Sequence, residues 1–391
     1  HILTLLQRAV FPTDGVITCF RDGEVTLRSN RREDGFTVSL KEIGYQGIEP
    51  GDLVVHGMDG FAGSIGISDS RGKSSPVLVV LDSSQDKKYL MYYLRSMAYN
   101  NVFLALSTGI RVRSCDLKWN KLADLLYLVP PIVEQHKLVS FLDEKCSEID
   151  AMLSKTHASI EEYKKLKQAV ITQAVTKGVR GEREMKDSGV EWIGEIPKEW
   201  DILNLVAHTS MLTPMRDRPE NLDGPIPWIR IEDFDGKYIS SSKASLGVSK
   251  ETVRSMNLKI YPVGTILCTS SCIMGKCAIV SRELVSNQRF IGIIPDQNTC
   301  ENFLYYLMLS NSERMNYLAT GALQANLSRS SFEHLKVQFP SYQEQKEISD
   351  YLDTKCAEID KLIAKKEQLV KELESYKKSL IYEVVTGKRE G

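Results

Sequence analysis

Two long stretches of the chain carry apolar residues at the seven-residue spacing that is typical of paired helices. In residues 129–181 one register holds Leu142, Ile149, Tyr163 and Val170, and a companion register holds Met152 and Leu166. Residues 339–391 offer Leu352, Ile359, Leu362, Leu369, Tyr376 and Leu380 at heptad spacing. The pattern predicts one long helix in each stretch, with an apolar face for pairing or for docking a partner.

The two stretches are copies of one another, because residues 129–181 match residues 339–391 without a gap. "VEQHKLVSFLDEKCSEID" in the first copy recurs as "QEQKEISDYLDTKCAEID" in the second. Each helix is expected to begin after a proline and to end near Gly178 or Gly387. At 1.5 Å per residue each would be roughly 65 Å long, which suits a spacer. We expect the helices to pair antiparallel, since each one returns the chain to the next domain.

The segments before the two helices read as mixed domains that share weaker similarities. "EPGDLVVHG" from Glu49 and "PVGTILCTS" from Pro262 both predict a glycine turn followed by a strand. "YLMYYLRS" and "FLYYLMLS" both predict an apolar helix, and each domain is expected to close with a strand leading into its long helix. The expected architecture is α+β with a pseudo-two-fold repeat: domains over 1–128 and 182–338, and spacer helices over 129–181 and 339–391.

Composition narrows the class of protein. The chain has 391 residues, 42% of them hydrophobic, which fits two packed domains without a membrane span. It begins "HILTLLQ", without Met or a secretory signal, so we expect N-terminal residues to be missing. Eight scattered cysteines favour reduced thiols in the cytoplasm. Cys268, Cys272 and Cys277 form the one cluster, but it lacks the paired spacing of a zinc site, and no metal is expected.

A net charge of −1 excludes a protein that coats nucleic acid through bulk positive charge, so any contact with DNA must be local. Base reading needs Arg or Lys for guanine and Asn or Gln for adenine, with Ser able to hold phosphates. Polar loops of the first domain offer His56, Arg71, Lys73, Ser74, Arg111 and Arg113. Those of the second offer Arg216, Arg218, Arg230, Ser270, Ser271, Lys276, Asn287, Gln288, Arg289, Gln324, Asn326, Ser328 and Arg329. Any one of these loops is equally typical of a polar turn exposed to water.

Catalytic motifs are lacking. The sequence has no adenine-methyltransferase NPPF or DPPY segment, no GxxxxGK[ST] phosphate loop and no HExxH. Glu344-Gln345-Lys346 resembles a nuclease ExK element, but its repeat partner Glu134-Gln135-His136 lacks the lysine, and both stand at the start of a helix. We therefore assign both to structure. Trp228 is expected in the core.

This order of domain, long helix, domain, long helix resembles the specificity subunit (HsdS family) of type I restriction-modification systems. The resemblance rests on the repeated "EQ…LD.K..EID" helix start, the "VTK" and "VTG" helix ends, and "DSGVEWIGEIPKEWDI" from Asp187 to Ile202. It implies that each domain reads one half of a split, asymmetric DNA site. It also implies that the helices set the half-site separation and dock two methyltransferase subunits, which would bind S-adenosylmethionine. Whether a restriction and translocation subunit joins stays open. The family pattern has a second "WIGEIP"-like phrase ahead of the first domain, which this sequence lacks.

Two alternatives come from other classes of protein. A coiled-coil scaffold without base reading would have the same paired helices. An enzyme acting alone would need catalytic residues, and the sequence offers none.

Overall fold

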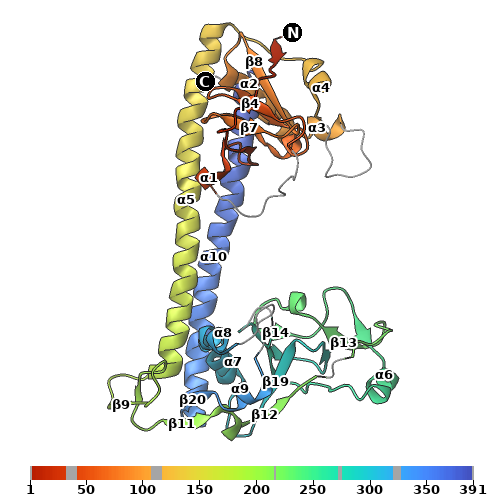
Figure 1. Ribbon diagram of the computed structural model, residues 1–391. Coiled ribbons are helices and arrows are strands. Elements are labelled where there is room, and N and C mark those ends of the chain that lie inside the picture. Colours follow the sequence, from red (N-terminus) through yellow and green to blue (C-terminus); the bar gives the residue numbers. More distant parts are fainter. Residues whose placement is uncertain are drawn as a thin grey trace. The chain divides into compact units, whose positions relative to one another are not determined.

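The computed structural model describes residues 2–31, 42–106, 117–214, 217–271, 275–319 and 327–389. Two compact units make up the chain: unit 1 holds residues 1–158 and 366–391, and unit 2 holds residues 159–365. Both long helices, α5 (Ile132–Lys177) and α10 (Tyr342–Val385), are continuous, and each contributes a part to both units (Figure 1). Helix α5 ends one residue before Gly178 (φ 75) and α10 ends two residues before Gly387 (φ 70), and both glycines adopt the left-handed conformation that glycine favours. The predicted helices and their ends are confirmed.

Unit 1 is built on an antiparallel sheet with strand order β1-β8-β5-β6. Helix α2 packs against β5 and β6, and its apolar side chains join the core of this sheet. The strands are β1 (Leu3–Leu5), β2 (Ile17–Cys19), β3 (Val25–Leu27), β4 (Gln46–Ile48), β5 (Leu53–His56), β6 (Ile65–Ile67), β7 (Gly72–Ser74) and β8 (Leu78–Ser83). The helices are α1 (Arg28–Arg31), η1 (Gly60–Ala62), α2 (Lys87–Tyr99), α3 (Val102–Ala105) and α4 (Trp119–Ala123).

Unit 2 repeats this plan with a sheet of order β12-β19-β16-β17-β14, against which α7 packs. Smaller sheets pair β9 with β10, β11 with β20, and β13 with β15 and β18. The strands are β9 (Met185–Asp187), β10 (Glu195–Pro197), β11 (Asp201–Asn204), β12 (Thr209–Leu212), β13 (Ile226–Ile229), β14 (Tyr238–Ile239), β15 (Gly247–Val248), β16 (Ile266–Thr269), β17 (Cys277–Val280), β18 (Val285–Ser286), β19 (Phe290–Pro295) and β20 (Lys336–Phe339). The helices are η2 (Leu205–Ala207), η3 (Ile231–Asp233), α6 (Lys250–Ser255), α7 (Glu301–Ser310), α8 (Ser312–Leu318) and α9 (Arg329–Glu333).

The weak similarities between the two domains correspond to equivalent positions in the sheets. Gly51 (φ 85) and Gly264 (φ 87) make the turns that precede β5 and β16, where a side chain would be strained. Strand β5 pairs with β8 and β6, just as β16 pairs with β19 and β17. The predicted strands and apolar helices are therefore confirmed, and β1-β8-β5-β6 corresponds to β12-β19-β16-β17.

The long helices pair antiparallel. In unit 2, Lys167 of α5 pairs with Asp360, and Arg180, which follows α5, pairs with Glu347. The residue numbers therefore rise along α5 and the residues after it as they fall along α10. In unit 1, Lys377 pairs with Asp150, which is the repeat equivalent of the Lys167 pair. The predicted pairing mode is confirmed in both units.

The register of the helix seam corrects part of the prediction. Leu142, Ile149, Leu352, Ile359 and Leu380 are buried as expected, and Tyr163 and Val170 are half-buried. The companion residues are instead Val139, Cys146, Leu153 and Ile160 in α5, with Ile363 and Val370 in α10, while the half-buried Leu373 continues the first register. The predicted companions are exposed to 40% or more: Met152, Leu166, Leu362, Leu369 and Tyr376. The prediction stepped three residues from Ile149, whereas the seam steps four.

The strand expected at the end of each domain forms only in unit 2. There β20 pairs with β11 and leads into α10. The repeat counterpart of β20, residues 126–129, forms no strand. The physical reason is that a strand needs a partner for its main-chain hydrogen bonds, and no described segment of unit 1 occupies the position of β11.

Candidate nucleic-acid interface

Three loops meet in unit 2 at the end of β16. The Ser270 N–H donates to the Arg289 carbonyl (2.9 Å), and the Leu327 N–H donates to the Ser270 carbonyl (2.9 Å). A fourth loop joins them, because the Asn287 N–H donates to the carbonyl of Ile229, the residue before Arg230 (3.3 Å). Segments far apart in sequence that were predicted separately as reading loops are therefore brought together.

Unit 1 has the same junction at the end of β5. The Gly57 N–H donates to the Val77 carbonyl (2.8 Å), and the Leu117 N–H donates to the Gly57 carbonyl (2.9 Å). Gly57 follows β5 as Ser270 follows β16, and Leu117 is the repeat counterpart of Leu327. The two units thus present one loop arrangement, with different side chains on it.

The side chains at the unit 2 junction differ in how far they reach solvent. Lys276, Gln288 and Arg289 are exposed, and Ser270 and Asn287 are half-buried. The Arg230 guanidinium is 3.2 Å from Glu232 but keeps an exposed fraction of 34%. Ser271 is buried, with only 6% of its surface exposed, and its role as a DNA contact stays a prediction.

Two of the predicted residues, Ser328 and Arg329, make contacts within helix α9 itself. The Ser328 hydroxyl accepts from the Ser331 N–H and caps the helix, which is the role that serine favours at this position. The Arg329 Nε is 2.7 Å from the Glu333 carboxylate, one helical turn away, and the Arg329 side chain stays 55% exposed. Arg329 therefore remains able to meet a phosphate.

In unit 1, His56 lines a polar hollow of about 700 Å³ together with Thr18, Arg21, Arg28 and Arg31. The Nδ1 atom of His56 accepts from the N–H groups of Met58 (3.3 Å) and Asp59 (3.0 Å), so Nε2 carries the proton. Burial lowers the pKa of His56 below its ordinary value, which keeps the ring neutral.

The rest of the hollow is suited to a polar ligand group. Ser64, which also lines it, is fully buried, and its hydroxyl has no hydrogen-bond partner among the described residues. Arg21 pairs with Asp59 (3.0 Å) and Arg31 with Asp22 (2.7 Å), so the cations are held in place but partly neutralised. Arg21 and Arg28 were not among the residues predicted from the sequence, because they approach His56 only through the fold.

The remaining described unit 1 candidates lie in β7 or just before it, and the structure does not bring them to the His56 hollow. Arg71 pairs with Asp14 and Glu49 and stacks on Phe11, and Lys73 pairs with Glu42 at 2.7 Å. Ser74 is fully buried on the strand that pairs with β4, and its role as a DNA contact stays a prediction. Arg218 is exposed in unit 2. Outside the described residues lie Arg111, Arg113, Arg216, Gln324 and Asn326.

The ExK-like residues are engaged in the fold. Glu344, 2% exposed at the first turn of α10, accepts from Arg183 (2.6 Å) and from the Trp200 Nε1 (3.1 Å). Gln345 accepts from the Cys300 N–H (2.7 Å), and Gln135 accepts from the Asp86 N–H (3.0 Å). The repeated glutamine thus ties the start of each long helix to the start of α7 or α2.

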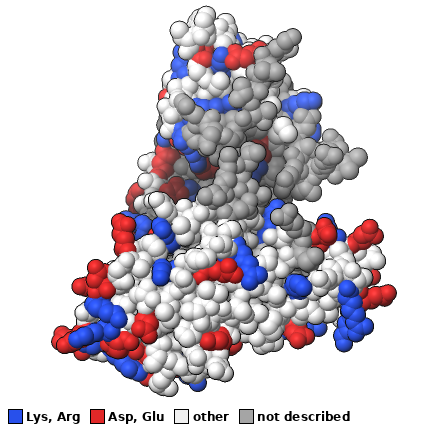
Figure 2. All heavy atoms as spheres, turned by 60° about the horizontal axis from the view of Figure 1, so that its bottom comes forward, with Lys and Arg blue, Asp and Glu red and all other residues white. Residues whose placement is uncertain are grey.

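Positive and negative side chains are interspersed over the face drawn in Figure 2, in keeping with the net charge of −1. Cys268 and Cys277 face each other on β16 and β17 with Sγ atoms 2.7 Å apart, while Cys272 lies outside the described residues. The described residues hold no cluster of metal-ligating side chains. Nor does the described part of the chain contain a helix with the length and hydrophobicity to span a bilayer.

Comparisons with known proteins agree on one family. Residues 201–372 match the sequence profile of the type I restriction modification DNA specificity domain. The MjaIX specificity subunit of Methanocaldococcus jannaschii is 34% identical over 181 residues, which cover 44% of this chain and 41% of that subunit. The putative MjaX specificity subunit of the same organism is 26% identical over 77% of this chain and 67% of that subunit. The alignment with the MjaIX subunit thus spans less than half of that protein.

Solved structures show the same fold at low sequence identity. A chain from a study of complex assembly and conformational transition of the type I restriction-modification system has a TM-score of 0.71 and 12% identity, over 87% of this chain and 83% of that one. The HsdS subunit from Thermoanaerobacter tengcongensis has a TM-score of 0.50 and 14% identity, over 88% and 83%. Residues 201–372 are thus similar to the type I restriction modification DNA specificity domain, and the chain is similar to type I restriction enzyme specificity subunits.

Proposed function

We propose that this chain reads a bipartite, asymmetric DNA site, one half with each unit, and performs no catalysis itself. The observation that carries the proposal is the loop junction shared by the two units, Gly57 with Val77 and Leu117 in one and Ser270 with Arg289 and Leu327 in the other. One scaffold with different side chains suits two half-sites of different sequence. Around it stand exposed Lys276, Gln288 and Arg289 in unit 2, groups able to bond base edges and phosphates.

The proposal assigns the chemistry to two methyltransferase subunits that bind S-adenosylmethionine and dock on the paired helices in the cytoplasm. Exposed apolar residues occur in repeat-equivalent pairs: Met152 and Tyr376 in unit 1, Leu362 and Leu166 in unit 2. In an antiparallel pair these positions flank the same side of the seam. Each unit therefore offers one copy of an apolar patch, as two copies of one partner would need.

Partner subunits would also explain how a protein with a net charge of −1 holds DNA. We expect the chain alone to bind DNA weakly and the assembly with methyltransferase subunits to bind its own site tightly, with a steeper dependence on salt because more phosphates are contacted. Binding isotherms at several salt concentrations test this. If the chain alone bound the site as tightly and as specifically as the assembly does, the proposed contribution of the methyltransferase subunits to DNA binding would be contradicted.

Side chains at the junction give a sharper test. In the assembled complex, replacing Lys276 and Arg289 together by Ala should weaken binding to the cognate site about tenfold or more, since a base contact contributes about 1–3 kcal/mol. Lys198→Ala is the control, because Lys198 pairs with Glu184 beside β10 and takes no part in the junction. A scaffold without base reading would show the same affinity in both variants.

A further inference from the structure

An arginine on the short helix α8 stacks on two aromatic rings at the surface of unit 2. The guanidinium carbon of Arg314 lies 3.9 Å from the centre of the Trp192 ring and 4.9 Å from that of Tyr317. Its Nε atom is buried without a hydrogen-bond partner, and no described carboxylate pairs with the guanidinium. Because the rings fix the plane of the guanidinium, its N–H groups are held ready for an acceptor that the described residues do not supply.

The stacked arginine lines a pocket beside α5. The pocket encloses about 340 Å³, and its lining includes Thr172 of α5 together with Trp192, Arg314 and Tyr317. Figure 1 shows α8 beside the long helices in unit 2. Glu313 also lines the pocket and is exposed, but neighbouring residues of a helix do not face each other. The pocket therefore suits a carboxylate, whose two oxygens can each accept an N–H of the guanidinium.

The pocket is continuous with the apolar patch on which the proposed function places a partner. Leu166 of that patch is 48% exposed, and Ala169 and Thr172, which follow at steps of three residues, are exposed as well. Residues three apart are neighbours on a helix surface, so the three form a ridge from the patch to the pocket. Trp192 is 42% exposed and Tyr317 is 78% exposed. Trp, Tyr and Arg are enriched at the energetic centres of protein–protein interfaces, so a protein partner fits this surface better than a duplex phosphate does.

Unit 1 also places a cation on an aromatic ring beside a long helix. Gln168 of α5 is another lining residue of the Arg314 pocket, and its repeat counterpart is Lys378 of α10. The Lys378 Nζ atom lies 5.5 Å from the centre of the ring of Tyr99, the last residue of α2. Lys378 is exposed and has no carboxylate partner among the described residues. The two units thus present an unpaired cation at related positions, although different residues supply it.

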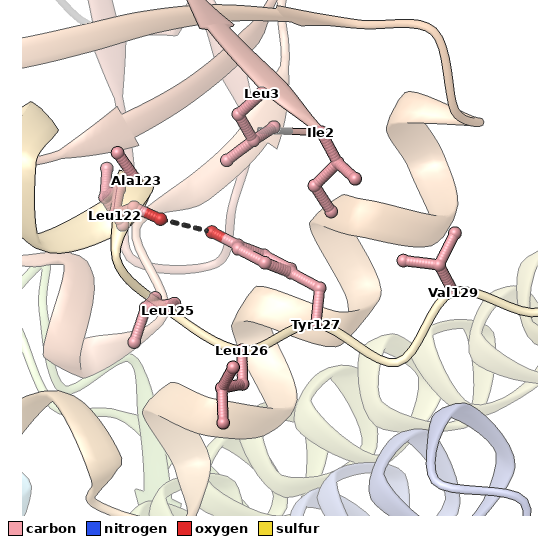
Figure 3. A pocket seen from close by; sticks show the side chains of 8 residues that line it. All are labelled: Ile2, Leu3, Leu122, Ala123, Leu125, Leu126, Tyr127 and Val129. Atoms are coloured by element: carbon pink, nitrogen blue, oxygen red, sulfur yellow. Dashed lines mark hydrogen bonds between the residues drawn. The ribbon is translucent and has the colours of Figure 1, made fainter.

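Another hollow of unit 1 lacks such a charge. Figure 3 shows it with Leu122, Leu125 and Leu126 around Tyr127, whose hydroxyl donates to the Leu122 carbonyl (2.9 Å). No charged side chain is among its described lining residues. An acidic group buried there would lack a counter-charge, so Lys378, and not this hollow, is the feature of unit 1 that resembles the Arg314 pocket.

We propose that each unit binds one acidic side chain of a methyltransferase partner, at Arg314 in unit 2 and at Lys378 in unit 1. The inference rests on the proposed function, in which two copies of one partner dock on the paired helices. Two copies present the same carboxylate twice, which matches a ring-stacked, unpaired cation in each unit. The guanidinium donates two N–H groups to the carboxylate in unit 2, whereas the ammonium acts as a point charge in unit 1. The cations thus add an ionic contact to the apolar patch of each unit.

The number of bound methyltransferase subunits tests the proposal in the full chain. Native mass spectrometry counts the copies at a partner concentration that just saturates the unsubstituted chain with two. Arg314→Glu should weaken the binding of one copy about tenfold or more, so that complexes with a single copy predominate, and Lys378→Glu should do the same. The double variant should be mostly free. Arg254→Glu is the control, because Arg254 is exposed on α6, away from the pocket, and this variant should keep both copies.

Further outcomes decide the assignment. Arg314→Gln removes the charge but keeps a planar side chain, and it should weaken the same copy even if Arg314→Glu fails to fold. Two copies bound with unchanged affinity by the folded Arg314 variants would overturn the proposal. Two bound copies together with about tenfold weaker DNA binding than in Arg254→Glu would identify a duplex phosphate as the occupant and would also overturn it. An unsubstituted chain that binds no methyltransferase would overturn the proposed function as well.

Discussion

The ammonium of Lys377 lies 2.7 Å from both carboxylate oxygens of Asp150, across the antiparallel seam of unit 1. Unit 2 repeats the contact, with Lys167 2.7 and 2.6 Å from the oxygens of Asp360. Each helix places one lysine, Lys167 or Lys377, in the apolar seam, where a charged side chain is unfavourable. The ion pair with the aspartate of the other helix offsets this cost, and it forms only when the helices are aligned as observed. The pairs therefore help to select the antiparallel register.

The loss of stability caused by reversing one charge of the Asp150–Lys377 pair should be recovered when the second charge is reversed too. Asp150→Lys brings two cations together and should lower the free energy of unfolding of unit 1 by about 1 kcal/mol. Adding Lys377→Asp should restore most of that loss. Denaturant unfolding of the two single variants and the double variant measures the coupling, and strictly additive losses would contradict a role for the pair in alignment.

The buried glutamines at the helix starts should matter more than their neighbours. Gln345 donates to the carbonyls of Asn298 (3.1 Å) and Pro340 (3.0 Å) and accepts from Cys300. Gln345→Ala leaves these buried groups unpaired and should cost about 1–3 kcal/mol. Gln343→Ala, at an exposed position two residues away, is the control and should change stability by less than about 0.5 kcal/mol. Equal effects in urea unfolding would show that the contacts do not fix the helix start.

The observed seam predicts different effects for the replacement of Leu352 and of Leu362. Leu352 is fully buried and Leu362 is 41% exposed, although both fit a heptad pattern. Leu352→Ala should destabilise unit 2 by about 2–5 kcal/mol, whereas Leu362→Ala should have little effect on stability but should weaken binding of a methyltransferase subunit. Thermal unfolding and a pull-down with that subunit separate the two roles. A large loss of stability in the Leu362 variant would show instead that Leu362 packs in the helix seam.

His56 should make the stability of unit 1 depend on pH. Burial lowers its folded pKa below the ordinary value of 6.5, so between the two values the unfolded chain binds more protons. The contribution of neutral His56 to the free energy of unfolding is fully present above pH 6.5. It decreases as the pH falls below 6.5 and is lost as the pH passes through the pKa of His56 in the folded protein. Protonation also removes the acceptor that holds the N–H groups of Met58 and Asp59. Unfolding curves from about pH 5 to 7.5 should show this slope, and His56→Gln should abolish it. If the His56→Gln variant showed the same dependence of stability on pH, a titratable group other than His56 would be its cause.

Much of the architecture could be predicted because it is local or repeated. Proline and glycine bounded the long helices, and glycine turns followed by apolar runs located β5 and β16. The companion seam register was wrong because a heptad pattern admits both Met152 and Leu153 after Ile149. Only the position of the partner helix decides that Leu153 faces it.

The candidate sites were harder to predict because they depend on contacts between distant segments. Arg289 and Leu327 meet Ser270 through main-chain bonds that side-chain identity does not encode. Ser74 looked like its polar neighbours, but the pleat of β7 turns its hydroxyl inward. The missing strand over 126–129 was not foreseen either, because "LYLV" has good strand propensity and lacks only a partner.

Mapping of methylated adenines tests the central claim most directly. DNA from cells that carry this gene with its methyltransferase partner should show one motif with two specified blocks separated by unspecified positions. Exchanging Lys276 and Arg289 of unit 2 for Ala should relax or abolish one block and leave the other unchanged. A motif that is one continuous block, or changes in both blocks from this single substitution set, would contradict two independent readers in one chain.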